Sequence, residues 1–73
     1  MFDDKHCPNC GGSKLHRFSK VGREEAAYIN DKRGALDGHG WWRCTNQTPE
    51  GRCLWVQPHS HQAKGFSLPE SFR

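Results

Sequence analysis

The chain has 73 residues, of which 33% are hydrophobic and four are cysteines, and it carries a net charge of +3. This length allows one domain, and the apolar core of so short a chain supplies only about 3–5 kcal/mol of stability. The composition therefore excludes a large apolar core. Natural chains of this size add a metal or disulfides, and a structural zinc contributes about 10–16 kcal/mol in small fingers.

The sequence contains no apolar run of signal-peptide or transmembrane length. We therefore expect a cytoplasmic (intracellular) protein without membrane contact, in which the thiols stay reduced. A metal is then favoured over a disulfide framework. The mildly basic balance is weak evidence for nucleic acid, because nearby cations can simply neutralise a negatively charged thiolate centre.

The first predicted element is a metal-binding knuckle at residues 7–12, with the sequence CPNCGG. A metal draws both sulfurs to one point, so the backbone must curl tightly around it. Gly11 and Gly12 permit the positive φ angles and the close approach that this curl needs. Residues 1–6 are polar and are expected to fray, although Phe2 could cover an edge of the site.

Residues 15–21 are predicted to form a strand, because their apolar residues show no helical period. Gly22 can turn the chain. The following segment, residues 23–36, is ambiguous. Its acidic and alanine-rich start at 24–27 favours a helical turn, whereas Tyr28-Ile29 favours a strand.

Residues 37–40, with the sequence DGHG, are a strong turn signal. Residues 41–44 then predict a short aromatic strand that ends in a cysteine. Every residue type in 45–52 suits a loop, and 54–57 predict a third strand that Pro58 ends.

The order knuckle, strand, excursion, strand, knuckle, strand predicts a small, metal-stabilised, mostly β fold. We interpret it as a zinc ribbon with a three-stranded antiparallel sheet and an irregular excursion.

The expected division of the chain is a ribbon at residues 1–58 and a C-terminal tail at residues 59–73. The tail mixes Ser, Gln, Lys, Gly and Pro with a few apolar residues. It is either flexible or a segment that docks on the core or on a partner.

The four cysteines are expected to hold one zinc ion. The first pair has the standard C-x2-C spacing, whereas the second, C-x8-C, is irregular. An eight-residue loop can still return to a shared ion. The predicted ligands are Cys7, Cys10, Cys44 and Cys53. His6, His39, His59 or His61 could replace one of them, with His59 and His61 as the first candidates, and four thiolates also suit iron.

The cysteine pattern gives no sign of an enzyme. C-P-x-C also occurs in thiol–disulfide enzymes, but there it opens a helix, which the glycines that follow Cys10 start poorly. A catalytic zinc keeps one position open for water, and four available thiolates argue for a closed site. We therefore expect a non-enzymatic protein.

Basic and aromatic side chains are the candidate contacts with a partner protein or nucleic acid. Adjacent strand residues point to opposite faces, so one thin sheet cannot bury both Trp41 and Trp42. One is expected beside the metal, and the other is covered or exposed for stacking on bases or anchoring a protein. There is an alternative to each contact role. The small core could use every aromatic side chain, and the basic side chains could simply face solvent. The candidate contacts are Lys14, Arg17, Lys20, Lys32, Arg33, Trp41, Trp42 and Arg43.

One set of matching residues supports a family comparison. It comprises the CPNC start, Arg17, Ser19, an aromatic shortly before Cys44, Asn46, and a last cysteine followed by apolar residues. With these, residues 7–56 resemble the Ogr/Delta zinc-finger activators of phage late transcription. Phe18 stands where that family has threonine, C-x8-C replaces C-x4-C, and the link between the pairs is longer. The resemblance implies a regulator that docks on RNA polymerase or an associated transcription protein, with possible DNA contact.

A second set of residues gives another resemblance. CPNCGG, then Arg17-Phe18, then Gly38-x-Gly40-Trp41-x-x-Cys44, is similar to the N-terminal zinc ribbon of phage-type primases. That family's catalytic domain has no counterpart in this sequence, so we expect no primase activity. The resemblance implies a nucleic-acid-binding ribbon of the replication or transcription machinery, whose binding weakens steeply with salt. A structural accessory protein is the third hypothesis.

Overall fold

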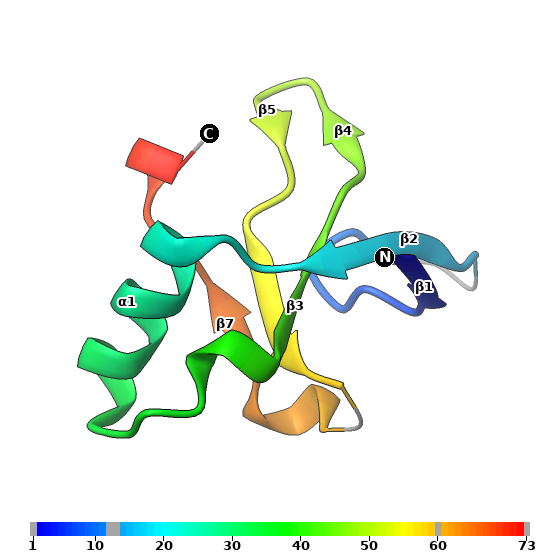
Figure 1. Cartoon of the computed structure of the whole chain (residues 1–73). Coiled ribbons are helices and arrows are strands. Elements are labelled where there is room, and N and C mark those ends of the chain that lie inside the picture. Colours follow the sequence, from blue (N-terminus) through cyan, green and yellow to red (C-terminus); the bar gives the residue numbers. More distant parts are fainter. Residues whose placement is uncertain (1, 12–13, 60, 73) are drawn as a thin grey trace.

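Five strands form one antiparallel sheet in the order β1-β2-β3-β6-β7 in the computed structural model, which describes residues 2–11, 14–59 and 61–72 (Figure 1). The strands of this sheet are β1 (Phe2–Lys5), β2 (His16–Lys20), β3 (Trp41–Cys44), β6 (Trp55–Pro58) and β7 (Phe66–Ser67). The predicted mostly β fold is confirmed. The three predicted strands form the centre of the sheet, and β1 and β7 extend it at its edges.

The segment expected to fray forms β1 instead. It pairs with β2 in an antiparallel register that places Lys5 opposite His16. Lys5 also forms an ion pair with Asp3, with 2.7 Å between Nζ and Oδ2. A second contact ties β1 to the far end of the chain, since His59 Nε2 lies 2.9 Å from the same carboxylate oxygen. The suggested covering role of Phe2 lies outside the described side chains.

The excursion between β2 and β3 is largely a helix, α1 (Arg23–Arg33). Glu25 Oε1 accepts a hydrogen bond of 2.5 Å from the Gly22 amide and so satisfies one of the free donors of the first turn. At the other end, Gly34 adopts φ 68° and its amide donates to the Asn30 carbonyl. These two caps favour the helix over the strand that Tyr28-Ile29 indicated. A short 3₁₀ helix, Gly38–Gly40, then leads into β3.

Two clusters of buried residues lie on opposite faces of the sheet. The metal-side cluster comprises Cys7, Phe18, Trp42, Cys44 and Cys53. The helix-side cluster comprises Ile29, Trp41, Leu54, Val56 and Leu68. Trp41 and Trp42 point to opposite faces of β3, yet they are only 1% and 6% exposed. Both are buried because the knuckles cover one face, while α1 and the C-terminal segment cover the other.

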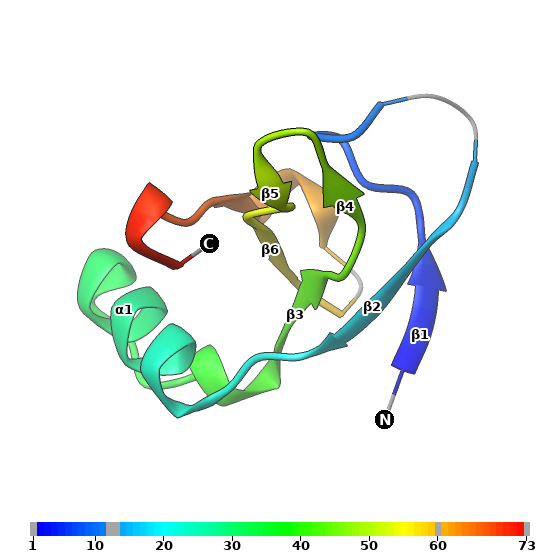
Figure 2. The ribbon, with the colours of Figure 1, turned by 90° about the horizontal axis from the view of Figure 1, so that it is seen from above.

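The C-terminal segment docks on the helix-side cluster. β7 pairs with β6, and the Leu68 amide donates a 2.8 Å hydrogen bond to the Leu54 carbonyl. Phe72, in a short 3₁₀ helix, packs against Tyr28 of α1 with 5.7 Å between ring centroids. Figure 2 shows this segment, in orange and red, beside α1. Of the two possibilities that the sequence left open for the tail, the docked arrangement is the one observed.

Candidate metal centre

The structure brings the four predicted cysteine ligands together at one end of the central strands. Their sulfur atoms all lie within 4.8 Å of one another. The separations are 3.7 Å for Cys7–Cys53, 3.8 Å for Cys10–Cys44 and 3.5 Å for Cys10–Cys53. A tetrahedral zinc with Zn–S bonds of about 2.3 Å requires sulfur separations of about 3.8 Å. The cysteine cluster therefore has the size and donor set of a four-coordinate metal site.

The first knuckle is a tight turn closed by backbone. The Gly11 amide donates a 3.0 Å hydrogen bond to the Cys7 carbonyl. Gly11 has φ 74°, a left-handed conformation that favours glycine. The sequence-based argument for glycine after Cys10 is confirmed at this position, whereas Gly12 lies outside the described residues.

The second knuckle accommodates its irregular C-x8-C spacing with a hairpin. Its strands β4 (Gln47–Thr48) and β5 (Gly51–Arg52) pair only with each other and extend away from the main sheet (Figure 1). At the base of this hairpin, the Cys53 amide donates a 2.8 Å hydrogen bond to the Asn46 carbonyl. The inserted residues thus return the chain to the metal centre, although the sequence alone predicted only a loop there.

Most of the ligand set lies inside the protein. Cys7, Cys44 and Cys53 are buried, whereas Cys10 is half-buried. None of them forms a disulfide, and they make up the only group of side chains among the described residues that could hold a metal ion. His59, the proposed substitute ligand, contacts Asp3 and the ring of Trp42 instead. His61 is exposed at the start of a 3₁₀ helix that spans Gln62–Lys64.

Proton sharing within the cluster makes the sulfurs unequal. Burial raises the pKa of Cys7 to about 12, and a hydrogen bond with Cys53 raises the pKa of Cys44. The same bond with Cys44, assisted by Asn9, lowers the pKa of Cys53. A metal ion must displace the protons that Cys7 and Cys44 retain, so metal binding strengthens as pH rises.

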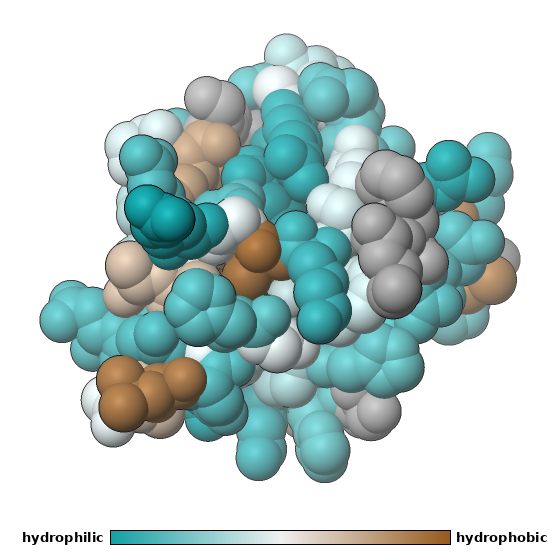
Figure 3. Space-filling model, in the orientation of Figure 1, coloured by the Kyte–Doolittle hydropathy of each residue, from teal (hydrophilic) through white to brown (hydrophobic). Residues whose placement is uncertain are grey.

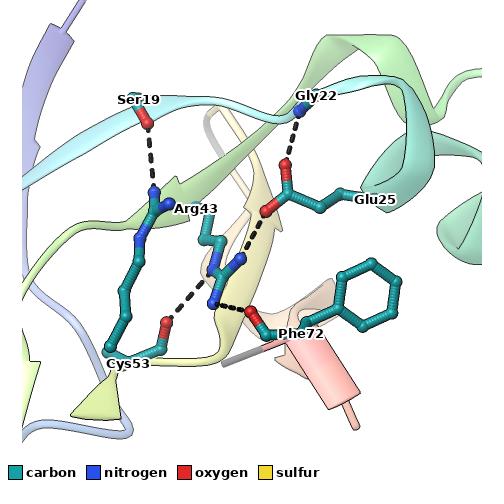
Figure 4. A network of polar contacts seen from close by, with 7 residues as sticks. Ser19, Gly22, Glu25, Arg43, Cys53 and Phe72 are labelled. Carbon is teal, nitrogen blue, oxygen red and sulfur yellow. Dashed lines mark hydrogen bonds and ion pairs between the residues drawn. The ribbon is translucent and has the colours of Figure 1, made fainter. Parts of the chain in front are cut away.

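Arg43 was predicted to contact a partner protein or nucleic acid, but the structure places it inside the protein. It is only 3% exposed, and its Nε donates to the Cys53 carbonyl at 3.2 Å. Its terminal nitrogens donate to Glu25 Oε2 at 2.5 Å and to the Phe72 carbonyl at 3.1 Å. Figure 4 shows the guanidinium between these three acceptors. Arg43 thus joins the second knuckle, α1 and the C-terminal segment, and this pairing compensates for burial of its charge.

Glu25 is the charged partner that makes this burial possible. Burial disfavours the ionised carboxylate, but hydrogen bonds from the Gly22 amide and from Arg43 outweigh that effect and hold the pKa of Glu25 below its usual value. The carboxylate therefore remains ionised at neutral pH and balances the guanidinium.

The other predicted contacts divide into three groups. Trp41 and Trp42 are buried, so neither is available as an exposed anchor. Lys32 and Arg33 are exposed near the end of α1, but they lie over the rings of Phe66 and Trp41, at 5.6 and 5.0 Å from the ring centroids. Arg33 also pairs with Asp37. Lys14, Arg17 and Lys20 are exposed in and beside β2.

Two residues of the site were not predicted from the sequence, Asn9 and Asn46. The side-chain amide of Asn9 donates to Cys53 Sγ, and that of Asn46 donates to Cys10 Sγ. A signal for them exists in the sequence, since each follows the first cysteine of its pair by two residues.

The comparisons with known proteins identify no relative. No protein-family model matches the chain, and no curated protein or solved structure is significantly similar to it. Within the described residues, no helix is long and apolar enough to cross a membrane.

Proposed function

We propose that the chain is a non-enzymatic zinc-ribbon regulator that docks on RNA polymerase or an associated transcription protein. The observation that carries the proposal is the closed ligand set. Four sulfurs within 4.8 Å of one another supply every ligand that a tetrahedral ion takes, whereas a catalytic zinc keeps a position open. A metal held in this way stabilises the fold, and the function then belongs to the protein surface.

Zinc is the ion we propose for the centre. Four thiolates in a tetrahedral arrangement suit zinc and iron, and zinc is the usual ion of a structural ribbon site. Elemental analysis of the protein purified without added metal distinguishes the two. One equivalent of zinc supports the proposal, and one equivalent of iron contradicts it.

The docking surface we propose lies at the end of α1. Leu36 is 90% exposed and borders a shallow depression, whose other lining residues are Ala27, Asn30, Asp31, Gly34 and Ala35. Single exposed leucines are common, but an exposed leucine beside a hollow with both apolar and polar lining residues offers a partner protein an apolar anchor and polar contacts. Hydrophobic residues are otherwise scattered in small patches on the face shown in Figure 3. The choice of RNA polymerase as the occupant comes from the resemblance to the Ogr/Delta activators.

A binding measurement with purified RNA polymerase tests this proposal. Leu36→Asp removes apolar area worth about 1.5–3 kcal/mol when buried, so we expect binding to weaken about tenfold or more. Leu15→Asp is the matched control, because Leu15 is also exposed (52%) but lies beside β2. Nuclease treatment should leave the wild-type interaction intact. Absence of wild-type binding, or equal loss in both variants, contradicts the proposal.

A nucleic-acid-binding ribbon is the second candidate, and one observation favours it. Lys14, Arg17 and Lys20 are exposed along one short segment. The register of the sheet places Asp4 opposite Arg17, which reduces the positive charge of that segment. Three phosphate contacts on duplex DNA would give a slope of about −2.7 in a plot of log affinity against log salt. Binding with that slope, lost in a Lys14→Ala, Arg17→Ala, Lys20→Ala triple variant, would favour this candidate. A structural accessory protein would bind neither polymerase nor nucleic acid.

A further inference from the structure

The two asparagines at the metal centre form a reciprocal pair of hydrogen bonds between the knuckles. Asn9 belongs to the first knuckle, but its side-chain amide donates to Cys53 of the second at 3.5 Å. Asn46 belongs to the second knuckle, and its amide donates to Cys10 of the first, also at 3.5 Å. Each asparagine therefore contacts the last cysteine of the opposite knuckle.

The local backbone directs both side chains toward the sulfurs. The turn closed between Gly11 and Cys7 encloses Asn9. Asn46 is fixed at the base of the hairpin, where its carbonyl accepts the Cys53 amide. Asn46 thus contacts a cysteine of its own knuckle through the main chain and one of the other knuckle through the side chain. Loss of either amide would remove a direct link between the two halves of the centre.

The donors also have a chemical effect on the sulfurs. Four thiolates around a divalent ion leave excess negative charge, and N–H groups that point at sulfur offset part of it. Such neighbours orient the ligands, and their removal typically lowers metal affinity about 10- to 100-fold. The effect is expected to be larger at Cys10, because this half-buried ligand is the one most accessible to water or a competing chelator.

We propose that Asn9 and Asn46 are positioning residues that hold the two knuckles around the metal ion and set how firmly it is retained. The inference rests on the proposed metal centre, and it assigns a role to side chains that are not themselves ligands.

The test uses the full chain loaded with cobalt, whose sulfur-to-metal charge-transfer band reports on the thiolates. The variants are Asn9→Asp and Asn46→Asp, which keep the side-chain size but present no amide donor. Gln47→Ala is the matched control, since it removes an exposed amide from the same hairpin. We expect each Asp variant to lose cobalt to a chelator about tenfold more readily, with the charge-transfer band at longer wavelength. The control should match the wild type.

Asn46→Gln provides a second measurement if the Asp variants do not fold. It retains the donor on a longer side chain, so it should hold cobalt more firmly than Asn46→Ala. Equal retention in these two variants overturns the proposal. So does weaker retention in the Asp variants with an unshifted band, because that result indicates a purely structural effect.

The same experiment separates this inference from the metal centre itself. A wild-type chain that takes up neither cobalt nor zinc overturns both proposals. A wild-type chain that binds cobalt, with Asp variants that match it in retention and spectrum, overturns only the role of the asparagines.

Discussion

The two faces of the central sheet are held by different forces. On one face, a metal-side cluster brings three buried cysteines together with Phe18 and Trp42. On the other face, the helix-side cluster consists of apolar side chains from α1, the sheet and the C-terminal segment. Burial of apolar surface stabilises the second cluster regardless of the ion, whereas we expect the first to need an ion that holds its sulfurs together. Arg43 links the faces, since its guanidinium contacts the carbonyl of Cys53, a predicted ligand, and also contacts α1 and the C-terminal segment.

The largest loss of stability and of metal binding is expected when one predicted ligand of the metal-side cluster is replaced. Cys53→Ser removes a buried thiolate that the other three sulfurs cannot replace, so metal retention should be nearly abolished and most of about 10–16 kcal/mol lost. Cobalt titration followed by absorbance measures the retention. Full retention would contradict the four-cysteine assignment and point to His59 or His61 as a ligand.

Replacement of Arg43, which links the two faces, should cause the next largest loss of stability. Arg43→Met leaves the Glu25 carboxylate without its buried partner, which is expected to destabilise the fold by about 3–5 kcal/mol. Lys20→Met, at the exposed end of β2, is the control and should change stability little. Chemical denaturation of the zinc-loaded variants measures both. The assigned role of Arg43 is wrong if the two variants are equally stable.

A conservative substitution in the helix-side cluster should lower stability less and should leave metal binding unchanged. Ile29→Val removes one buried methylene from α1 and is expected to cost about 0.5–1.5 kcal/mol of the free energy of unfolding. Its zinc affinity in the folded state should match that of the wild type. A large loss of zinc affinity would show that packing on the helix-side face also controls the metal centre.

The smallest expected effect is the pH-dependent part of the Glu25 contribution to stability, which is set by the lowering of its pKa. Its pKa is lowered in the folded chain, so its stabilising contribution is complete above the unfolded value of about 4.3 and is lost as pH falls through the folded pKa. Glu25→Gln should therefore be less stable than the wild type at pH 7, and the difference should shrink below pH ~4. Denaturation with excess zinc measures it, at pH values at which metal analysis shows the ion still bound to both proteins. A constant difference would contradict the lowered pKa.

The parts of the fold that the sequence predicted correctly are those with local chemical signals. The C-x2-C-G knuckle and the two central strands around Cys44 and Cys53 are specified by residues close to one another in the chain. The helix was also signalled locally, by the acidic pair Glu24-Glu25 at its start and by Gly34 at its end. The competing strand preference of Tyr28-Ile29 obscured it. In the structure, Ile29 lies on α1 and belongs to the helix-side cluster.

The features that could not be predicted depend on partners far away in the chain. Nothing local marks Arg43 as buried, because its three acceptors, in Cys53, Glu25 and Phe72, are separated from it by 10, 18 and 29 residues. The same holds for β1, which needs β2 to form, and for the C-terminal segment, which needs β6 and α1. Burial of both Trp41 and Trp42 follows only once both faces of the sheet are covered.

The central claim is that the cysteine cluster binds a metal ion on which the fold depends. Its most direct test is removal of the metal with a strong chelator at neutral pH, followed by far-UV circular dichroism and tryptophan fluorescence. We expect loss of the folded spectrum and exposure of the buried tryptophans, both reversed by one equivalent of zinc. A chain that elemental analysis shows to be free of metal and that keeps its folded spectrum would contradict the account.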